Sequence, residues 1–265
     1  TISGRFHGGE ILTDFQNWAD SLKEMGIKRI KGNLIADNSY FTQDILGDGW
    51  NWDDEPYWYS AQPSALTFND NCVDFTITPA EKVGEPVKIE QNPNINYLSV
   101  FNSATTSPAD SATDLKITRE RARNLALISG SYPKNKKAEK ESISVENPAL
   151  FFIETLHTVL LENGIEIQGE NKVCNKPVNV KETLFIHKSP KLAEIVKVIN
   201  KKSHNLYAEQ LLKTLGVKFN EEGSFNSGAD VVANWGYSIG IPPSEIIMVD
   251  GSGLSRKNFV SPYAT

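Results

Sequence analysis

The sequence has few of the residues that bind metals or form covalent cross-links. It contains two cysteines, Cys72 and Cys174, and four scattered histidines. Neither set shows the close spacing of a zinc site, and no H-E-x-x-H pattern occurs. We therefore expect no metal and no cofactor. Whether the two cysteines are buried thiols or form a disulfide stays open at this point.

Long apolar runs and an excess of basic residues are also missing. No apolar stretch approaches the ~18 residues of a membrane span, so we expect no transmembrane segment in this chain. The 27 Lys and Arg residues against 33 Asp and Glu residues give a net charge of −6. That balance argues against nucleic acid as a partner, because nucleic-acid binding needs a clustered basic face. With 39% apolar and 23% charged residues, the composition is typical of a soluble globular protein.

The hydrophobic pattern predicts an α+β, multi-domain chain in three pieces. In residues 1–60, apolar residues at helical spacing run from Ile11 to Met25, and a short strand is expected over 33–37. This piece reads as a small, partial α/β unit. Residues 184–265 are expected to be mainly helical, with a strand near 246–249.

The middle piece, residues 61–183, is expected to be β-rich because apolar and polar residues alternate along it. One helix interrupts this pattern, with Asn147 as its cap and Pro148 in its first turn. The expected strands cover residues 73–78, 87–90, 98–100, 115–117 and 125–128.

A three-residue motif, Ser203-His204-Asn205, lies between two predicted helices, the second of which has a plausible end at Gly216. Taken alone, a Ser or Asn at such a junction is best interpreted as a helix cap, because both satisfy free N–H groups. The pattern S-x-N is also the middle one of three motifs, with S-x-x-K and K-T-G, that build the site of penicillin-binding serine enzymes.

A second informative segment is residues 250–256, Asp-Gly-Ser-Gly-Leu-Ser-Arg. Two glycines in three positions permit a tight turn, which Asp250 can cap, so a purely structural role fits well. The segment is not a G-x-S-x-G nucleophile elbow, because the spacing of serine and glycine differs.

Several collinear blocks together make this sequence resemble the penicillin-binding protein 4 type of D-alanyl-D-alanine carboxypeptidase and endopeptidase, peptidase family S13. In order and spacing the blocks cover most of the chain: residues 26–41, 49–54, 60–71, 201–209 and 250–258. The resemblance implies that 1–60 and 61–183 are domains inserted into a penicillin-binding, β-lactamase-like transpeptidase domain. Residues 184–265 would be a central part of that domain.

The resemblance also implies a function. The substrate would be a peptidoglycan stem peptide that ends in, or is crosslinked through, D-alanine, and β-lactam antibiotics would bind at the same site. A nucleophilic serine would form an acyl-enzyme, which water then hydrolyses. Export to the periplasm or another extracytoplasmic space is implied, although no signal-like segment is visible in this chain.

In that scheme Ser203 and Asn205 are the expected catalytic residues. Ser203 would relay a proton toward the leaving amine, because a hydroxyl both donates and accepts. Asn205 would offer its amide to the bound peptide and hold the catalytic lysine. His204 would be an outward-facing spacer.

Substrate recognition would fall to Arg256, Trp50 and Asp53. The planar guanidinium of Arg256 would bind a substrate carboxylate. Trp50 would form an aromatic wall and Asp53 would pair with a substrate ammonium, charges that a meso-diaminopimelate side chain offers. Trp50 fits equally well as domain-interface packing, and Asp53 as a turn residue.

The sequence departs from the family in the other two motifs. Its S-x-x-K, Ser131-Tyr-Pro-Lys134, lies in a lysine-rich stretch and contains Pro133, so we interpret it as a chance match in a solvated loop. No K-T-G occurs. We expect an interior fragment of a larger enzyme that is inactive alone. A non-catalytic peptidoglycan-binding or scaffold homologue is the main alternative, and a related serine β-lactamase fits the large inserted domains less well.

Overall fold

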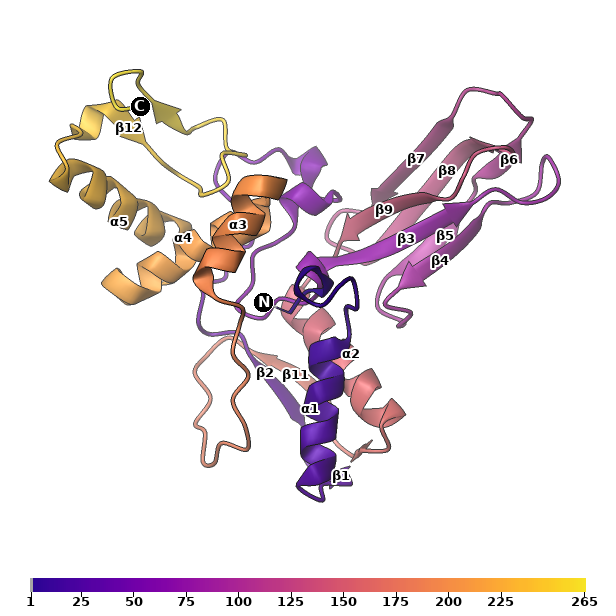
Figure 1. Cartoon of the computed structure of the whole chain (residues 1–265), viewed down its shortest axis with the longest axis horizontal. Coiled ribbons are helices and arrows are strands. Elements are labelled where there is room, and N and C mark those ends of the chain that lie inside the picture. The colour runs from indigo at the N-terminus through magenta and orange to yellow at the C-terminus, as the bar shows by residue number, and fades with distance from the viewer. Residues whose placement is uncertain (1) are drawn as a thin grey trace.

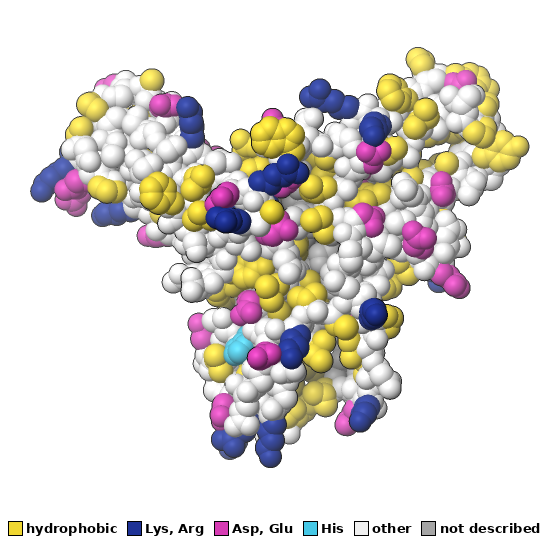
Figure 2. Space-filling model, turned by 180° about the vertical axis from the view of Figure 1, so that it is seen from behind, with side chains coloured by type: hydrophobic (Ala, Val, Ile, Leu, Met, Phe, Trp, Pro, Cys, Tyr) yellow, Lys and Arg dark blue, Asp and Glu magenta, His cyan; other side chains and the backbone are white. Residues whose placement is uncertain are grey.

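The structure is a computed structural model that describes residues 2–265, and its architecture is α+β, as predicted. Figure 1 shows three groups of elements: two packed helices with short parallel strands, an elongated β arm, and a helical group that contains the C-terminus. On the face seen in Figure 2, Lys and Arg side chains are interspersed with Asp and Glu and form no continuous basic patch.

The first group is an α/β unit built from two distant stretches of sequence. Strand β1 pairs in parallel with β10, and β2 pairs in parallel with β11. Its elements are α1 (Thr13–Glu24), α2 (Pro148–Glu162), β1 (Arg29–Ile30), β2 (Leu34–Asp37), β10 (Glu166–Ile167) and β11 (Asn171–Cys174). The boundaries at 60 and 183 stay predictions, and this pairing favours grouping residues 148–174 with the first piece.

The β arm comprises two sheets, and the five strands expected from alternation all lie in it. One sheet has the order β4-β3-β9, and the other has the order β5-β8-β6 with β7 also on β8. Their bounds are β3 (Cys72–Thr78), β4 (Lys88–Asn92), β5 (Ser99–Asn102), β6 (Thr105–Ser107), β7 (Asp114–Arg119), β8 (Leu125–Pro133) and β9 (Glu139–Ser144).

The segment from Ser131 to Lys134 differs from the solvated loop expected for it. Ser131 and Pro133 are the last residues of β8, paired in parallel with β6. Lys134 follows the strand in a turn. Ser131 and Lys134 therefore do not lie on one turn of a helix, which is the arrangement that an S-x-x-K pair needs.

The helical group comprises α3 (Leu192–Lys202), α4 (Asn205–Asn220), α5 (Phe225–Ser238) and the hairpin of β12 (Ile246–Ile247) with β13 (Phe259–Val260). The expected end of the second helix at Gly216 is wrong, because α4 continues to Asn220. Gly216 serves a different purpose: a Cβ there would collide with the carbonyl oxygen of Glu222 and the nitrogen of Gly228. The glycine permits close packing between α4 and α5.

Aromatic side chains form the centre of the core. Phe15 of α1 packs against Phe68 and against Phe152 of α2, with ring centroids 5.0 and 4.9 Å apart. The same apolar cluster continues into β3 through Phe75. Both cysteines are free thiols: Cys72 is buried at the start of β3 and Cys174 ends β11.

Candidate active site at the corner between α3 and α4

The S-x-N motif lies at the corner where α3 ends and α4 begins. Ser203 is exposed and ends α3 in a left-handed backbone conformation, with φ 52° and ψ 52°. Asn205 is the first residue of α4, and its Nδ2 donates a hydrogen bond of 2.8 Å to the carbonyl oxygen of Tyr59. Within residues 2–265 the hydroxyl of Ser203 and the carboxamide oxygen of Asn205 make no hydrogen bond, so both remain available for further contacts.

His204 is buried, and the prediction that it faces outward is wrong. Only 2% of the residue is exposed. Its Nδ1 accepts a hydrogen bond of 3.4 Å from the Tyr207 N–H and caps α4. Its Nε2 lies 3.2 Å from Oδ2 of Asp70. A neutral ring that accepts at Nδ1 carries its proton on Nε2, so the imidazole can donate to Asp70.

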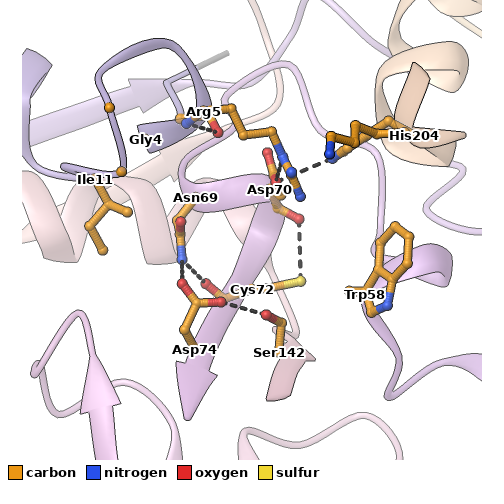
Figure 3. Close-up of a pocket in the computed structure, with 14 residues that line it drawn as sticks. Gly4, Arg5, Ile11, Trp58, Asn69, Asp70, Cys72, Asp74, Ser142 and His204 are labelled. Carbon is orange, nitrogen blue, oxygen red and sulfur yellow. Dashed lines mark hydrogen bonds and ion pairs between the residues drawn. The ribbon is translucent and has the colours of Figure 1, made fainter. Parts of the chain in front are cut away.

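Asp70 is the centre of a cluster of charged and polar side chains next to the α3–α4 corner. The Arg5 Nε and the Tyr207 hydroxyl each donate to it, both at 2.6 Å. Figure 3 shows Arg5 and His204, from two different elements, both directed at Asp70. Burial by itself raises the pKa of Asp70, but the contacts with His204, Arg5 and Tyr207 prevail and hold the pKa well below its ordinary value.

A cavity of about 550 Å³ opens beside this cluster. Figure 3 shows that the residues lining it come from the N-terminal segment, the start of β3 and the α3–α4 corner. The lining carries both signs of charge, with Arg5 and Lys202 against Asp70 and Asp74. At the corner that holds the motif, Lys202 and His204 line this cavity, whereas Ser203 and Asn205 are not among its lining residues.

The segment 250–256 is a tight loop organised around Asp250, as its structural interpretation predicted. Asp250 is 1% exposed. Its carboxylate accepts hydrogen bonds from the amides of Gly253 and Ser255, at 2.9 and 2.6 Å, and from Nδ2 of Asn258 at 2.6 Å. A fourth donor, the Trp50 Nε1, lies 2.9 Å away.

Glu209 ties this loop to the helix that carries Asn205. It lies one turn after Asn205 on α4 and is fully buried. Its two carboxylate oxygens accept the N–H groups of Gly251 and Ser252, each at 2.8 Å. Burial raises the pKa of Glu209 to about 7, although both amide donors favour the ionised form.

Lys213, one further turn along α4, is also fully buried. Its Nζ donates to the carbonyl oxygens of Thr42 and Asp44, at 3.3 and 3.0 Å, and lies 4.6 Å from the centre of the Phe225 ring. Burial lowers the pKa of Lys213, while the Asp44 carboxylate opposes that effect. One face of α4 therefore holds three separate loops through Asn205, Glu209 and Lys213.

The structure places two of the three expected recognition residues in neighbouring segments. Trp50 is half-buried, with its indole N–H on Asp250 and its ring 6.1 Å from that of Phe225, so it serves at least as packing. Arg256 is exposed at the end of the same loop and forms no ion pair among the described residues. Asp53 is exposed in a short 3-10 helix (Trp52–Asp54), and no contact joins it to Arg256 within residues 2–265.

Sequence reasoning placed His204 in the motif but facing outward, and it gave Asp70 and Glu209 no role in this region. A signal was present for Glu209, because Asn205, Glu209 and Lys213 recur every four residues along the helix and so share one face. The sequence signal for Asp70 was weaker and consisted only of its position in the run Asn69-Asp70-Asn71. All three of these residues have positive φ values, which Asn and Asp tolerate better than other residues except glycine.

Two general features complete the description. Among the described residues, no group of three or more His, Cys, Asp or Glu side chains is arranged to hold a metal ion. Across residues 2–265, no helix has both the length and the hydrophobicity needed to cross a membrane.

Comparison with known proteins assigns the chain to a family. Residues 10–265 match the model of the D-Ala-D-Ala carboxypeptidase 3 (S13) family. A D-alanyl-D-alanine carboxypeptidase of Actinomadura sp. is 31% identical over 256 residues, which cover 94% of this chain and 47% of that protein. The D-alanyl-D-alanine carboxypeptidase DacB of Haemophilus influenzae is 29% identical over 262 residues, 97% of this chain and 54% of that protein.

Solved structures agree. The crystal structure of penicillin binding protein 4 (dacB) from Haemophilus influenzae has a TM-score of 0.81 and 27% identity, over 94% of this chain and 55% of that one. The same protein complexed with a β-lactam gives a TM-score of 0.74. The chain thus spans about half the length of the relatives it matches. By these matches, the chain belongs to the D-Ala-D-Ala carboxypeptidase 3 (S13) family.

Proposed function

We propose that this chain is part of a serine-type D-alanyl-D-alanine carboxypeptidase and endopeptidase that cleaves peptidoglycan stem peptides and binds β-lactams. The observation that carries the proposal is the corner at Ser203 and Asn205. An exposed hydroxyl and a carboxamide with a free oxygen lie on either side of His204, which itself lines a cavity that contains charged residues. Family membership indicates the reaction, and the corner offers two of the polar groups that such a reaction would use.

Ser203 and Asn205 would act on either side of the reacting bond. The hydroxyl of Ser203 would pass a proton toward the leaving amine, for which it needs one acceptor and one donor position. Asn205 has one N–H on Tyr59 and so is held in place. Its carboxamide oxygen would accept from the catalytic lysine and its second N–H would donate to the peptide.

Arg256, Trp50 and Asp53 would recognise the substrate side chain. The guanidinium of Arg256 is exposed and would pair with a carboxylate. Trp50 would contribute a ring face, because its N–H is engaged by Asp250. Asp53 would pair with an ammonium group. A substrate that carries both charges, such as a meso-diaminopimelate residue, satisfies all three.

The nucleophile and its base would come from sequence outside this chain. Ser131 lies in a strand and Lys134 in the turn after it, so they do not share a helix turn, and no K-T-G occurs in the sequence. The full-length protein would act on the wall from the periplasm or another extracytoplasmic space. A non-catalytic scaffold remains the second candidate, because the chain itself contains one of three active-site motifs.

Labelling with a fluorescent penicillin tests the proposal. The full-length protein should form one stable acyl adduct per molecule, detected by mass spectrometry, and this chain alone should form none. Ser203→Ala in the full-length protein should lower the acylation rate about a hundredfold, since general acid–base groups contribute at least that much. Ser21→Ala on α1 is the matched control and should leave the rate unchanged.

Two results would contradict this prediction. An adduct on the chain alone would mean that it contains a nucleophile. Failure of the full-length protein to react, while it remains folded and binds peptidoglycan, would favour the scaffold.

A further inference from the structure

We propose that His204 is a positioning residue: it is held by Asp70 and sets the backbone of the corner so that Ser203 and Asn205 keep their relative orientation. The chemistry in this inference rests on the proposed function, whereas the geometry is that of the described residues. His204 does not touch the reacting atoms and acts through its two neighbours.

His204 is fixed from several directions. Its ring stacks on Tyr207, with centroids 3.9 Å apart and an interplanar angle of 27°. The tilted indole of Trp58 lies 6.3 Å away on a separate segment. Nδ1 holds the first turn of α4 and Nε2 faces Asp70 at 3.2 Å. The hydrogen bond at Nδ1, the close approach of Nε2 to Asp70 and the stacking on one face together restrict the ring to one orientation, and so restrain the backbone on either side of it.

Asp70 is itself held rigidly from the opposite side. Arg5 and Tyr207 bind its carboxylate. Its loop has three consecutive Asn or Asp residues with φ between 44° and 56°, a conformation that these residue types tolerate and that the neighbouring groups hold in place. Asn69 bonds to the carbonyl oxygen of Cys72 and to Asp74, and Asn71 bonds to the carbonyl oxygen of Gln62.

Ser203 has the same kind of backbone conformation as this loop. A serine at φ 52° is sterically disfavoured and needs neighbours that hold it there. The residue directly after it is His204, which is anchored to Asp70, and Asn205 follows with its own anchor on Tyr59. The anchor on Asp70 therefore maintains the turn that presents the serine hydroxyl outward.

The competing interpretation is that His204 only fills space. In that case any flat ring of similar size would serve, because the stacking on Tyr207 and the burial would persist. The charged group that faces the imidazole is Asp70, and Arg5, Asp74 and Lys202 lie beyond it along the cavity. Under the competing interpretation, none of these charges would affect the orientation of Ser203 and Asn205. Substitutions that separate ring shape from hydrogen bonding distinguish the two interpretations.

The experiment measures penicillin acylation rates in the full-length protein, well below the melting temperature of each variant. His204→Phe keeps a ring on Tyr207 but removes the donor to Asp70 and the acceptor for the Tyr207 N–H. His204→Gln keeps an N–H donor close to the Nε2 position. We expect a ten- to hundredfold lower acylation rate for His204→Phe, because small misplacements of reacting groups cost that much, and a rate within about threefold of wild type for His204→Gln.

Asp70→Asn keeps the shape of the side chain, and its acylation rate provides an independent test if His204→Phe does not fold. It should lower the rate about tenfold, and the double variant should be no slower than the slower single variant, because both act through one contact. Val159→Ala, a buried substitution in α2, is the stability control and should acylate at the wild-type rate.

The outcomes separate the two proposals. Acylation of wild type with an equal rate in folded His204→Phe and Asp70→Asn overturns the positioning role and leaves the proposed function intact. Absence of acylation in wild type overturns the proposed function, and the positioning role with it. Slow His204→Phe together with near-normal His204→Gln supports the inference.

Discussion

Glu209, which is buried, and Asp70, which is partly buried, are two carboxylates near the same corner whose pKa values are shifted in opposite directions. Burial raises the pKa of Glu209 to about 7, so the folded protein binds this proton more tightly than the unfolded chain does. Asp70 has a lowered pKa because His204, Arg5 and Tyr207 stabilise its charge against the effect of burial. Its contribution to stability is present above its ordinary pKa of 3.8 and is lost as the pH falls below that value.

Glu209→Gln tests the first of these responses. The contribution of Glu209 to stability is largest below pH 4.5, its ordinary pKa, and falls as the pH rises to about 7. The expected fall is about 3 kcal/mol. The free energy of unfolding of wild type, measured by urea denaturation from pH 4.5 to 7.5, should therefore decrease more steeply with pH than that of Glu209→Gln. Identical slopes for the two proteins would contradict the assignment.

The sequence correctly placed the Ser203-His204-Asn205 motif at a junction between two helices, but it oriented His204 wrongly. A motif fixes residue types and spacing, and these are visible in a linear sequence. Whether the middle side chain faces inward depends on Asp70, which lies 134 positions earlier in the chain. A buried polar group needs such a partner, and pairing of that kind is set by the tertiary fold.

At the scale of elements, α4 and α5 are packed unusually closely through glycines. A Cβ at Gly228 would collide with the carbonyl oxygen of Leu212, and Gly216 has a similar close contact. α5 is further fixed by Ser224, whose hydroxyl accepts the Ser227 N–H at 3.0 Å as its cap. α5 can therefore pack this closely against α4 only because Gly216 and Gly228 have no side chains.

Gly228→Ala should separate these two helices slightly. We expect a loss of about 1–3 kcal/mol in the free energy of unfolding, the usual range for overpacking, measured by chemical denaturation. Gly32→Ala is the matched control: a Cβ there meets no atom within 4 Å and φ is not left-handed, so its stability should be close to that of wild type. Equal stability of both variants would show that α5 moves freely.

Periodicity predicted most elements correctly, including α2 with its cap at Asn147, whose side chain accepts the Leu150 N–H at 3.2 Å. The predicted end of α4 at Gly216 was wrong for a physical reason. Glycine is common after helix ends, but it is also used where two backbones meet closely. Local sequence does not distinguish these uses, since the second one depends on a helix that comes later in the chain.

At the scale of the whole molecule, one apolar cluster joins the α/β unit to the β arm. It extends from Phe15 on α1 through Phe68 and Phe151 to Phe75 and Ile77 on β3. The α/β unit is formed by strands that precede the arm in the sequence, β1 and β2, paired with strands that follow it, β10 and β11. Unfolding of one part therefore exposes the core of the other.

Phe15→Ala should destabilise both parts together. The side chain is fully buried, and its removal should cost about 3–5 kcal/mol. Hydrogen exchange should accelerate in β3 as well as in α1 and α2. Phe101→Ala is the control of the same residue type, because Phe101 is 62% exposed on the arm and surface substitutions change stability by about 0.5 kcal/mol or less. Faster exchange confined to α1 and α2 would show that the arm unfolds independently.

The sequence by itself determined the α+β class, the main helices and strands, and the motif at Ser203 and Asn205, because periodicity and short motifs depend on neighbouring residues. Only the tertiary structure decided that β10 and β11 return to β1 and β2, that His204 is buried against Asp70, and that Glu209 binds the loop of Asp250. These contacts join positions far apart in the chain, and their partners are chosen by packing and charge in three dimensions.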